Sequence, residues 1–239
     1  MALRKTFTFN GENSSYYGLY ISGAKVFNTT RRSYTKVPVP SRNGDFIQSD
    51  NRYENQVYQY EAFLFGDVER KTDDIASWLL SAKGYCRLED DYHPDFYRKA
   101  FFGENMEYEL TDLIGGTGVI TFDCKPGKWL KSGEHIVTIT EANSHIFNPT
   151  KFDAEPIIRI YGKGSVTING YTVTLDRKGS VYAEVDCEAK QVIENTGAFM
   201  NDSVTITNWK FPVLSPGKNT IILGSGVTKV EVIPNWWTV

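Results

Sequence analysis

Apolar and polar residues alternate along most of this chain, and the period of two predicts a protein built mainly from β-strands. Two short runs of this kind are Thr6–Phe9 and Tyr17–Ile21, and two longer ones cover residues 31–37 and 53–65. Phe, Tyr, Val, Ile and Thr fill these runs, and such side chains fit a half-buried pleated surface. Further strands are expected at residues 85–88, 98–102, 106–110, 119–124 and 135–140.

One segment has the period of a helix instead. Its apolar residues recur on one helical face, and they are Ile75, Trp78, Leu79 and Ala82. Thr72 is the expected cap, since Asp73 and Asp74 would then stand where the helix dipole favours negative charge. Gly84 would end the helix. We therefore predict an α-helix over about residues 72–84.

The most polar and turn-rich stretch is Glu141–Pro149, and we take it as a domain boundary. The expected domains are residues 1–142 and 143–239. The second contains only strand patterns, among them a hairpin in which Asn169-Gly170 supplies the two positive φ angles of a type I′ turn. Regularly spaced short strands of this kind predict a β-sandwich.

A proline-rich segment lies between the two long strand runs. Pro38 and Pro40 flank Val39, and an Arg-Asn-Gly-Asp turn follows before the strand pattern resumes. The chain is therefore expected to extend a stiff arm over about residues 38–53 and to return. Such an arm would grip a neighbouring subunit, and its interface residues would be Pro38, Val39, Pro40, Ser41, Arg42, Asn43, Gly44 and Asp45.

Composition limits the possible classes of protein. The 239 residues are 41% hydrophobic and 14% aromatic, which excludes a disordered chain. The net charge of −3 is spread evenly, so the clustered Lys and Arg that hold nucleic acid by its phosphates are missing. The three cysteines are odd in number and far apart, which argues against a disulfide scaffold or a zinc site. No apolar run approaches the ~20 residues of a membrane span, and we expect no signal peptide.

Patterns with catalytic potential do not form a site in the sequence. Gly115–Gly118 lacks the helix and spacing of a phosphate loop. Glu89-Asp90-Asp91 is interpreted as a solvated turn, since adjacent carboxylates point apart. Cys86 lies in an apolar strand pattern and is expected to be inert beside His93. We therefore expect no enzyme activity, cofactor or metal.

Two adjacent tryptophans raise an alternative function. An exposed Trp236 or Trp237 could stack on a sugar ring, as in a carbohydrate-binding module that attaches to cell-wall polysaccharide. Adjacent residues of an extended segment face opposite ways, so at most one ring would be free. Packing is the favoured interpretation of the pair.

An ordered set of short motifs carries a resemblance to a known family. The motifs are Phe7–Gly11 with Tyr17–Leu19, Val39–Asp45, Trp78-Leu79 with Gly84-Tyr85, Leu88–Pro94 with Arg98–Ala100, Phe122–Pro126, Asn148-Pro149, Ala154–Pro156, Gly162–Gly164 and Phe211–Gly217. Their order and spacing resemble the distal tail (Dit) proteins of siphophages. Ser41 departs from the family pattern, which more often has Gly there.

The resemblance implies a structural hub at the virion tail tip, made in the host cytoplasm. It implies a hexameric ring of N-terminal domains, split-barrel-like or sandwich-like, around a channel that DNA crosses without specific binding. Arms would embrace adjacent protomers, and galectin-like C-terminal β-sandwiches would project outward. The implied partners are the tail tube, the tape-measure protein, a tail-associated fibre or lysin protein and receptor-binding proteins.

Overall fold

The chain divides into two compact units, Met1–Lys128 with Val239 and Trp129–Thr238. The computed structural model describes residues 4–25, 27–103, 107–112, 115–179 and 181–239. The division falls earlier than the predicted 142/143. The strand expected near residue 137 pairs with a strand of the second unit. The turn-rich stretch itself contains a strand, β13 (Asn143–Asn148), in which exposed Asn143 and His145 alternate with inward Ile146.

The first unit is one antiparallel sheet that closes on itself. Its strands follow in space as β2 (Glu12–Asn13), β1 (Phe7–Phe9), β7 (Cys86–Asp90), β8 (Phe96–Phe101), β10 (Gly115–Cys124), β6 (Gln56–Phe65) and β3 (Leu19–Ile21), with β9 (Glu107–Asp112) also pairing with β10. Lys5, just before β1, bridges Ile21 of β3, and the Ile21 N–H donates to the Lys5 carbonyl at 2.9 Å. This bridge joins the two ends of the sheet and leaves fewer open edges.

Aromatic rings fill the inside of this sheet. The Phe7 ring stacks on Tyr60 at 5.3 Å and on Trp78 at 5.6 Å, and Phe9 lies 5.0 Å from Phe122. Phe7, Phe9, Tyr60 and Phe122 are at most 1% exposed, and Trp78 is 7% exposed. Rings at these separations add to the free energy of burial, so the cluster forms the centre of the first core.

The helix α1 (Val68–Leu80) covers one side of that core. It begins before the predicted residue 72 because the side chain of Asp67 accepts from the Arg70 N–H and caps it. Thr72 lies inside the helix, where its hydroxyl donates to the Val68 carbonyl at 2.7 Å. The four apolar residues predicted to share one face are buried as expected.

The second unit is a β-sandwich. One sheet runs β12 (Val137–Ile139), β21 (Val227–Ile233), β14 (Ile157–Gly162), β17 (Ala183–Asp186) and β18 (Gln191–Glu194). The other runs β13, β20 (Gly217–Leu223), β15 (Gly164–Ile168), β16 (Tyr171–Leu175) and β19 (Val204–Ile206). Inward residues of both sheets form one buried cluster. Asn169 and Gly170 have φ of 50° and 85°, which confirms the predicted type I′ turn.

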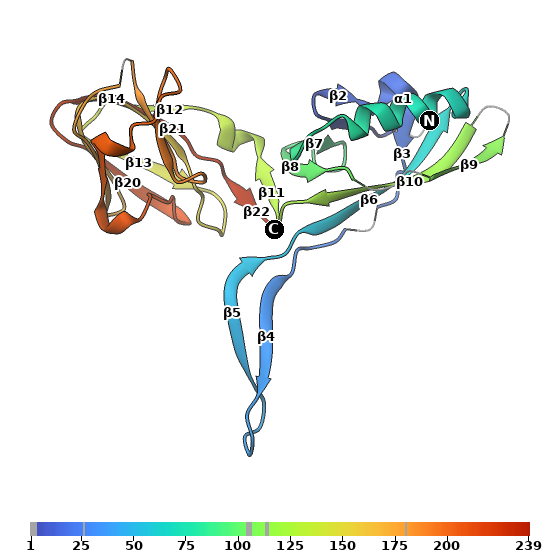
Figure 1. The fold of residues 1–239 in the computed structure, drawn as a ribbon, viewed down its shortest axis with the longest axis horizontal. Coiled ribbons are helices and arrows are strands. Elements are labelled where there is room, and N and C mark those ends of the chain that lie inside the picture. Colours follow the sequence, from blue (N-terminus) through green and yellow to red (C-terminus); the bar gives the residue numbers. More distant parts are fainter. Residues whose placement is uncertain (1–3, 26, 104–106, 113–114, 180) are drawn as a thin grey trace. The chain divides into compact units, whose positions relative to one another are not determined.

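The remaining elements are short. They are β11 (Lys128–Leu130), β22 (Trp237–Thr238) and the 3₁₀ turns η1 (Ser14–Tyr17), η2 (Lys131–Glu134), η3 (Asn201–Ser203) and η4 (Thr207–Trp209). Beyond them, β4 (Arg32–Pro38) and β5 (Asp45–Tyr53) form a separate two-stranded sheet, drawn as a long ribbon in Figure 1. The prediction of a mainly β protein with one α-helix and two β domains is confirmed across the described residues.

Replacing Phe122 by Ala should lower the free energy of unfolding of the first unit by about 3–5 kcal/mol, because the substitution leaves a cavity among packed rings. Urea titration followed by tryptophan fluorescence measures the loss. Tyr16→Ala is the matched control, since that residue is 80% exposed and removal of its ring should change stability by no more than about 0.5 kcal/mol. Equal losses in the two variants would contradict the assignment of the core.

Candidate functional site

The sequence-predicted arm is a β-hairpin. Strands β4 and β5 pair antiparallel from Pro38 opposite Asp45 through Val37 opposite Phe46 to Arg32 opposite Tyr53. The strand pairing begins at Arg32, so the arm starts earlier than the predicted residue 38. Among the described residues, neither strand pairs with any other strand. The hairpin is therefore held by its own ladder alone.

The tip of the hairpin is a turn built on Pro40. The Arg42 N–H donates to the Val39 carbonyl at 3.2 Å, and Ser41 has a φ of 61°. Proline first and a positive φ second is the arrangement of a type II turn, which favours glycine at the second position. Ser41 thus occupies a backbone conformation that suits the glycine more common in the Dit family. Gly44, with a φ of 85°, then returns the chain into β5.

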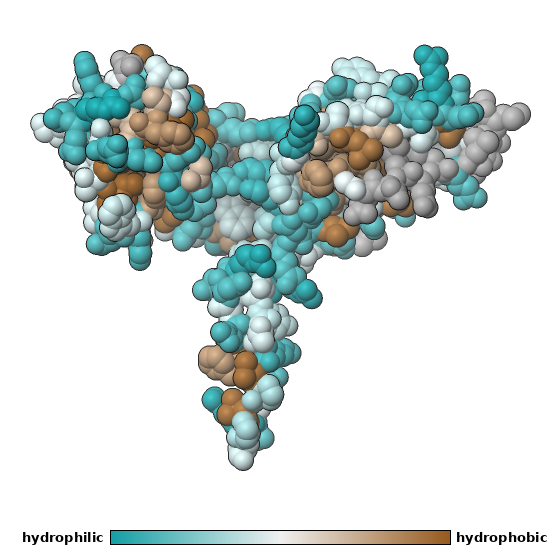
Figure 2. All heavy atoms as spheres, in the orientation of Figure 1, coloured by the Kyte–Doolittle hydropathy of each residue, from teal (hydrophilic) through white to brown (hydrophobic). Residues whose placement is uncertain are grey.

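Apolar side chains lie exposed on both faces of the hairpin. Directly opposite residues of a ladder share a face, so Val37 and Phe46 lie on one side and Ile47 lies beside Lys36 on the other. The Phe46 side chain is 58% exposed and that of Ile47 is 52% exposed. Figure 2 shows brown and tan atoms, the colours of more hydrophobic residues, on the outer part of the projecting hairpin. Nothing in the described part of the chain covers either face.

The root of the hairpin is closed by polar contacts. The Arg31 guanidinium donates to one Glu54 carboxylate oxygen from Nε at 2.9 Å and from Nη2 at 2.7 Å. The Glu54 N–H donates to the Arg31 carbonyl, and the Thr30 hydroxyl donates to the Glu54 carbonyl. These bonds fix where the two strands leave the first unit. The tip and both faces remain free for a partner.

A buried carboxylate lies in the first unit at Asp90. Its Oδ2 accepts from the Tyr60 hydroxyl at 2.7 Å, and its Oδ1 accepts from the backbone N–H groups of Tyr92 and His93 at 3.0 and 2.9 Å. The Tyr60 hydrogen bond and the nearby Arg98 cation hold the pKa of Asp90 below its ordinary value despite burial, which opposes them. The interpretation of residues 89–91 as a solvated turn is wrong for Asp90, because an alternating strand places it inward.

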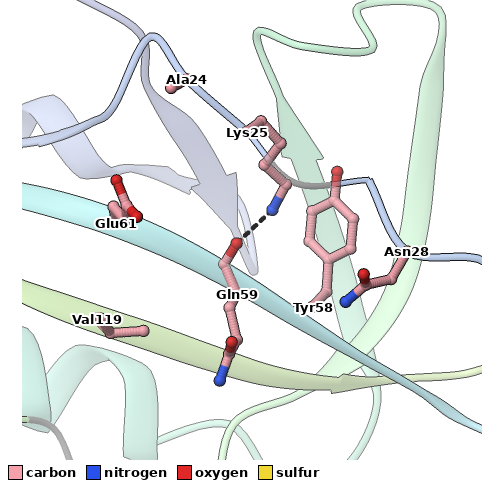
Figure 3. Close-up of a pocket in the computed structure, with 7 residues that line it drawn as sticks. All are labelled: Ala24, Lys25, Asn28, Tyr58, Gln59, Glu61 and Val119. Carbon is pink, nitrogen blue, oxygen red and sulfur yellow. Dashed lines mark hydrogen bonds between the residues drawn. The ribbon is translucent and has the colours of Figure 1, made fainter.

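A pocket of about 380 Å³ lies beside this region and holds Lys25. Figure 3 shows the Lys25 amine between Gln59, whose carbonyl accepts from it, and the ring of Tyr58. The amine lies 3.5 Å from the Tyr58 ring centroid and 4.2 Å from that of Tyr60. Burial lowers the pKa of Lys25 to about 8, with Arg98 acting in the same direction and Asp90 against it. No periodic pattern or motif in the sequence pointed to this lysine.

The two tryptophans considered for sugar stacking are packed. Trp236 is 5% exposed and belongs to the core of the second unit. Trp237 is half-buried, its Nε1–H donates to the Asp153 carbonyl at 2.8 Å, and its ring lies 4.7 Å from Phe152. The favoured interpretation, packing, therefore accounts for both rings. Trp209 is instead 93% exposed on η4.

Two of the three cysteines are buried thiols. Cys124 and Cys187 are buried, and burial raises the pKa of each thiol to about 12. All three cysteines are free, and Cys86 is half-buried in β7. In the described part of the chain, no group of three His, Cys, Asp or Glu side chains is placed to hold a metal ion. None of its helices is long and apolar enough to cross a membrane.

No family model matches this sequence, and no curated protein matches it. Among solved structures, the crystal structure of the SPP1 Dit (gp 19.1) protein matches with a TM-score of 0.74 over 98% of this chain and 99% of that chain, at 14% identity. The chain has the fold of a Dit protein. The SPP1 protein is described as a paradigm of the hub adsorption apparatus in phages that infect Gram-positive bacteria. The Dit resemblance in the sequence is thus confirmed for the fold.

The hairpin and the polar cluster around Asp90 differ in how well the sequence predicts them. The arm could be located from the sequence because prolines interrupt two strand runs. The Asp90 cluster could not, since a carboxylate run carries no sign of which member turns inward. The one signal that could have found it is the alternation of Leu88 and Asp90 on the buried face of β7.

The free energy of unfolding should increase with pH in the parent protein above about pH 8, and replacing Lys25 by Met should remove this increase. The folded pKa of about 8 lies below the ordinary 10.5, so between these values the unfolded chain binds a proton that the folded chain does not. The free energy of unfolding of the parent protein therefore increases as pH rises through this window. Urea titrations over a pH series should show the increase in the parent and in the exposed-lysine control Lys83→Met, but not in Lys25→Met. Parallel curves for all three would contradict the burial of Lys25.

Proposed function

We propose that this protein is a structural hub of a phage tail tip, which acts by assembly and carries out no catalysis. The observation that carries the proposal is the Dit fold over 98% of the chain together with a hairpin whose two faces are uncovered. Large exposed apolar side chains on such an element mark an interaction surface. A structural hub in a virion needs surfaces of this kind, since its activity is to hold other chains.

The hairpin would bind a neighbouring copy of the chain. Val37, Phe46 and Ile47 occupy both faces near the tip, so a partner that embraces the hairpin can bury them all. A contact between an arm and a different surface of the next protomer is heterologous, and repeated copies of it close into a ring when the rotation permits. We propose a homo-hexameric ring. Pro38 to Asp45 would lie within this contact.

The ring would link the tail tube to the host-adsorption apparatus. In this arrangement the tape-measure protein, a tail-associated fibre or lysin protein and receptor-binding proteins contact the hub, and DNA crosses the ring without specific binding. The net charge of −3 supports that role, because a channel free of clustered cations does not retain a polyanion. The second unit would be the galectin-like outer domain.

Replacing Phe46 and Ile47 together by Ser should weaken ring assembly and leave each unit folded. Burial of two large apolar side chains contributes about 3–6 kcal/mol per contact, so dissociation should rise more than a hundredfold. Mass photometry over a concentration series measures the oligomer, and negative-stain microscopy shows whether rings form. Gln48→Ser, on the same strand, is the matched control.

Two results would count against the proposal. An unchanged oligomer mass in the double variant would remove the hairpin from the interface. A parent protein that stays monomeric at high concentration and forms no ring would contradict the hub itself. Circular dichroism of the variants separates lost assembly from lost folding.

A further inference from the structure

A second pocket of the first unit is lined by two cationic side chains. The cavity is about 240 Å³ and is lined by Arg98, His93 and Lys128, among others. It is distinct from the pocket around Lys25, with which it shares Asn28 at its edge. A cavity of this size has room for several waters at ~30 Å³ each, or for a small ion with part of its hydration shell.

The Arg98 guanidinium lines this pocket without a hydrogen bond to any described residue. Arg98 is 5% exposed, and its Nε is fully buried and unpartnered. Its Nη1 lies 3.7 Å from Asp90 Oδ2, and its charge lies 4.0 Å from the Tyr58 ring centroid. Buried guanidinium groups are ordinarily bonded through their five donors, and leaving them unpaired is costly. The Nε of Arg98 therefore lacks an acceptor among the described residues.

Asp90 does not supply that acceptor. Asp90 already accepts three shorter hydrogen bonds, one at Oδ2 from the Tyr60 hydroxyl and two at Oδ1 from backbone N–H groups. Lys128 adds a second cation at the pocket, and burial and Arg98 together lower the pKa of its amine. The Nδ1 of His93 is also buried without a hydrogen bond, 3.4 Å from Asp90 Oδ1. Asp90 thus lies near both the Arg98 guanidinium and an imidazole nitrogen that has no hydrogen bond.

We propose that this pocket binds a small oxyanion such as phosphate, held by Arg98 and Lys128. The planar fork of Arg98 matches the paired oxygens of such an anion, and the Lys128 amine contributes a point charge. Lys128 makes one contact to a backbone oxygen of Val239, at 3.4 Å, which leaves two of its donors for the anion.

The pocket lies at the root of the hairpin. Phe27, Asn28 and Thr29 line it just before β4, and Gln56 lines it just after β5. An anion bound to Arg98 on β8 would therefore tie both ends of the arm to the body of the first unit. The binding claim does not depend on the hub function, since it can be measured whatever the oligomeric state.

Isothermal titration calorimetry of the full chain with sodium phosphate, at ionic strength matched with sodium chloride, tests the proposal. We expect saturable binding of one phosphate per chain. Lys128→Gln should weaken it about tenfold or more, because a charge-assisted hydrogen bond is lost. Arg98→Lys keeps a cation near Asp90 but removes the fork, and should abolish binding. Lys218→Gln, an exposed lysine of the second unit, should leave it unchanged.

Three results would overturn the site. They are the absence of saturable binding by the parent protein, equal weakening in Lys218→Gln and Lys128→Gln, and unchanged affinity in a folded Arg98→Lys protein. If Arg98→Lys does not fold, Lys128→Gln decides the outcome, because its half-exposed side chain can be replaced without unfolding. Hydrogen exchange at residues 27–29 should also slow when phosphate is added, and unchanged exchange there would contradict the link to the arm.

Discussion

A two-stranded ribbon has no interior, and this constraint governs how the protein can work. Strands β4 and β5 satisfy each other's backbone groups along one edge only, and side chains on both faces stay in water. An isolated hairpin of this kind is marginally stable. It gains stability when another surface covers Val37, Phe46 and Ile47. The first unit therefore carries an element that a covering surface would stabilise.

The rest of the first unit is arranged to hold that element firmly. The sheet closes through the bridge between Lys5 and Ile21, and aromatic rings fill its inside. The root of the hairpin is fixed by Arg31 and Glu54 on one side and adjoins the pocket of Arg98 on the other. Buried charge in a core is expensive unless it is paired. The ion pair of Arg98 and Asp90 lies in the interior of the unit, beside the root of the hairpin.

Much of the fold could be predicted from the sequence, because period-two alternation and the Asn169-Gly170 turn are local signals. The helix was predicted in the right region but too late, since the side chain of Asp67, and not that of Thr72, caps its first turn. The division at residue 128 was missed because the pairing of β12 with β21 joins residues far apart in the sequence. Within the candidate site, the arm was predictable because Pro38 and Pro40 interrupt two strand patterns. The alternation of Leu88 and Asp90 gave a weak local signal for the inward Asp90, whereas the unpartnered Nε of Arg98 depends on packing between segments far apart in the sequence.

The continuity of β5 with β6 has a mechanical consequence. Only Glu54 and Asn55 separate the two strands, so a pull on the hairpin acts directly on the start of β6. That strand pairs with β10 at ten successive positions, from Gln56 to Phe65. Ladder hydrogen bonds lie across the strand direction, so a load along β6 shears them together and does not open them one at a time. Tension transmitted from a neighbouring subunit would thus be shared by the longest ladder in the first unit.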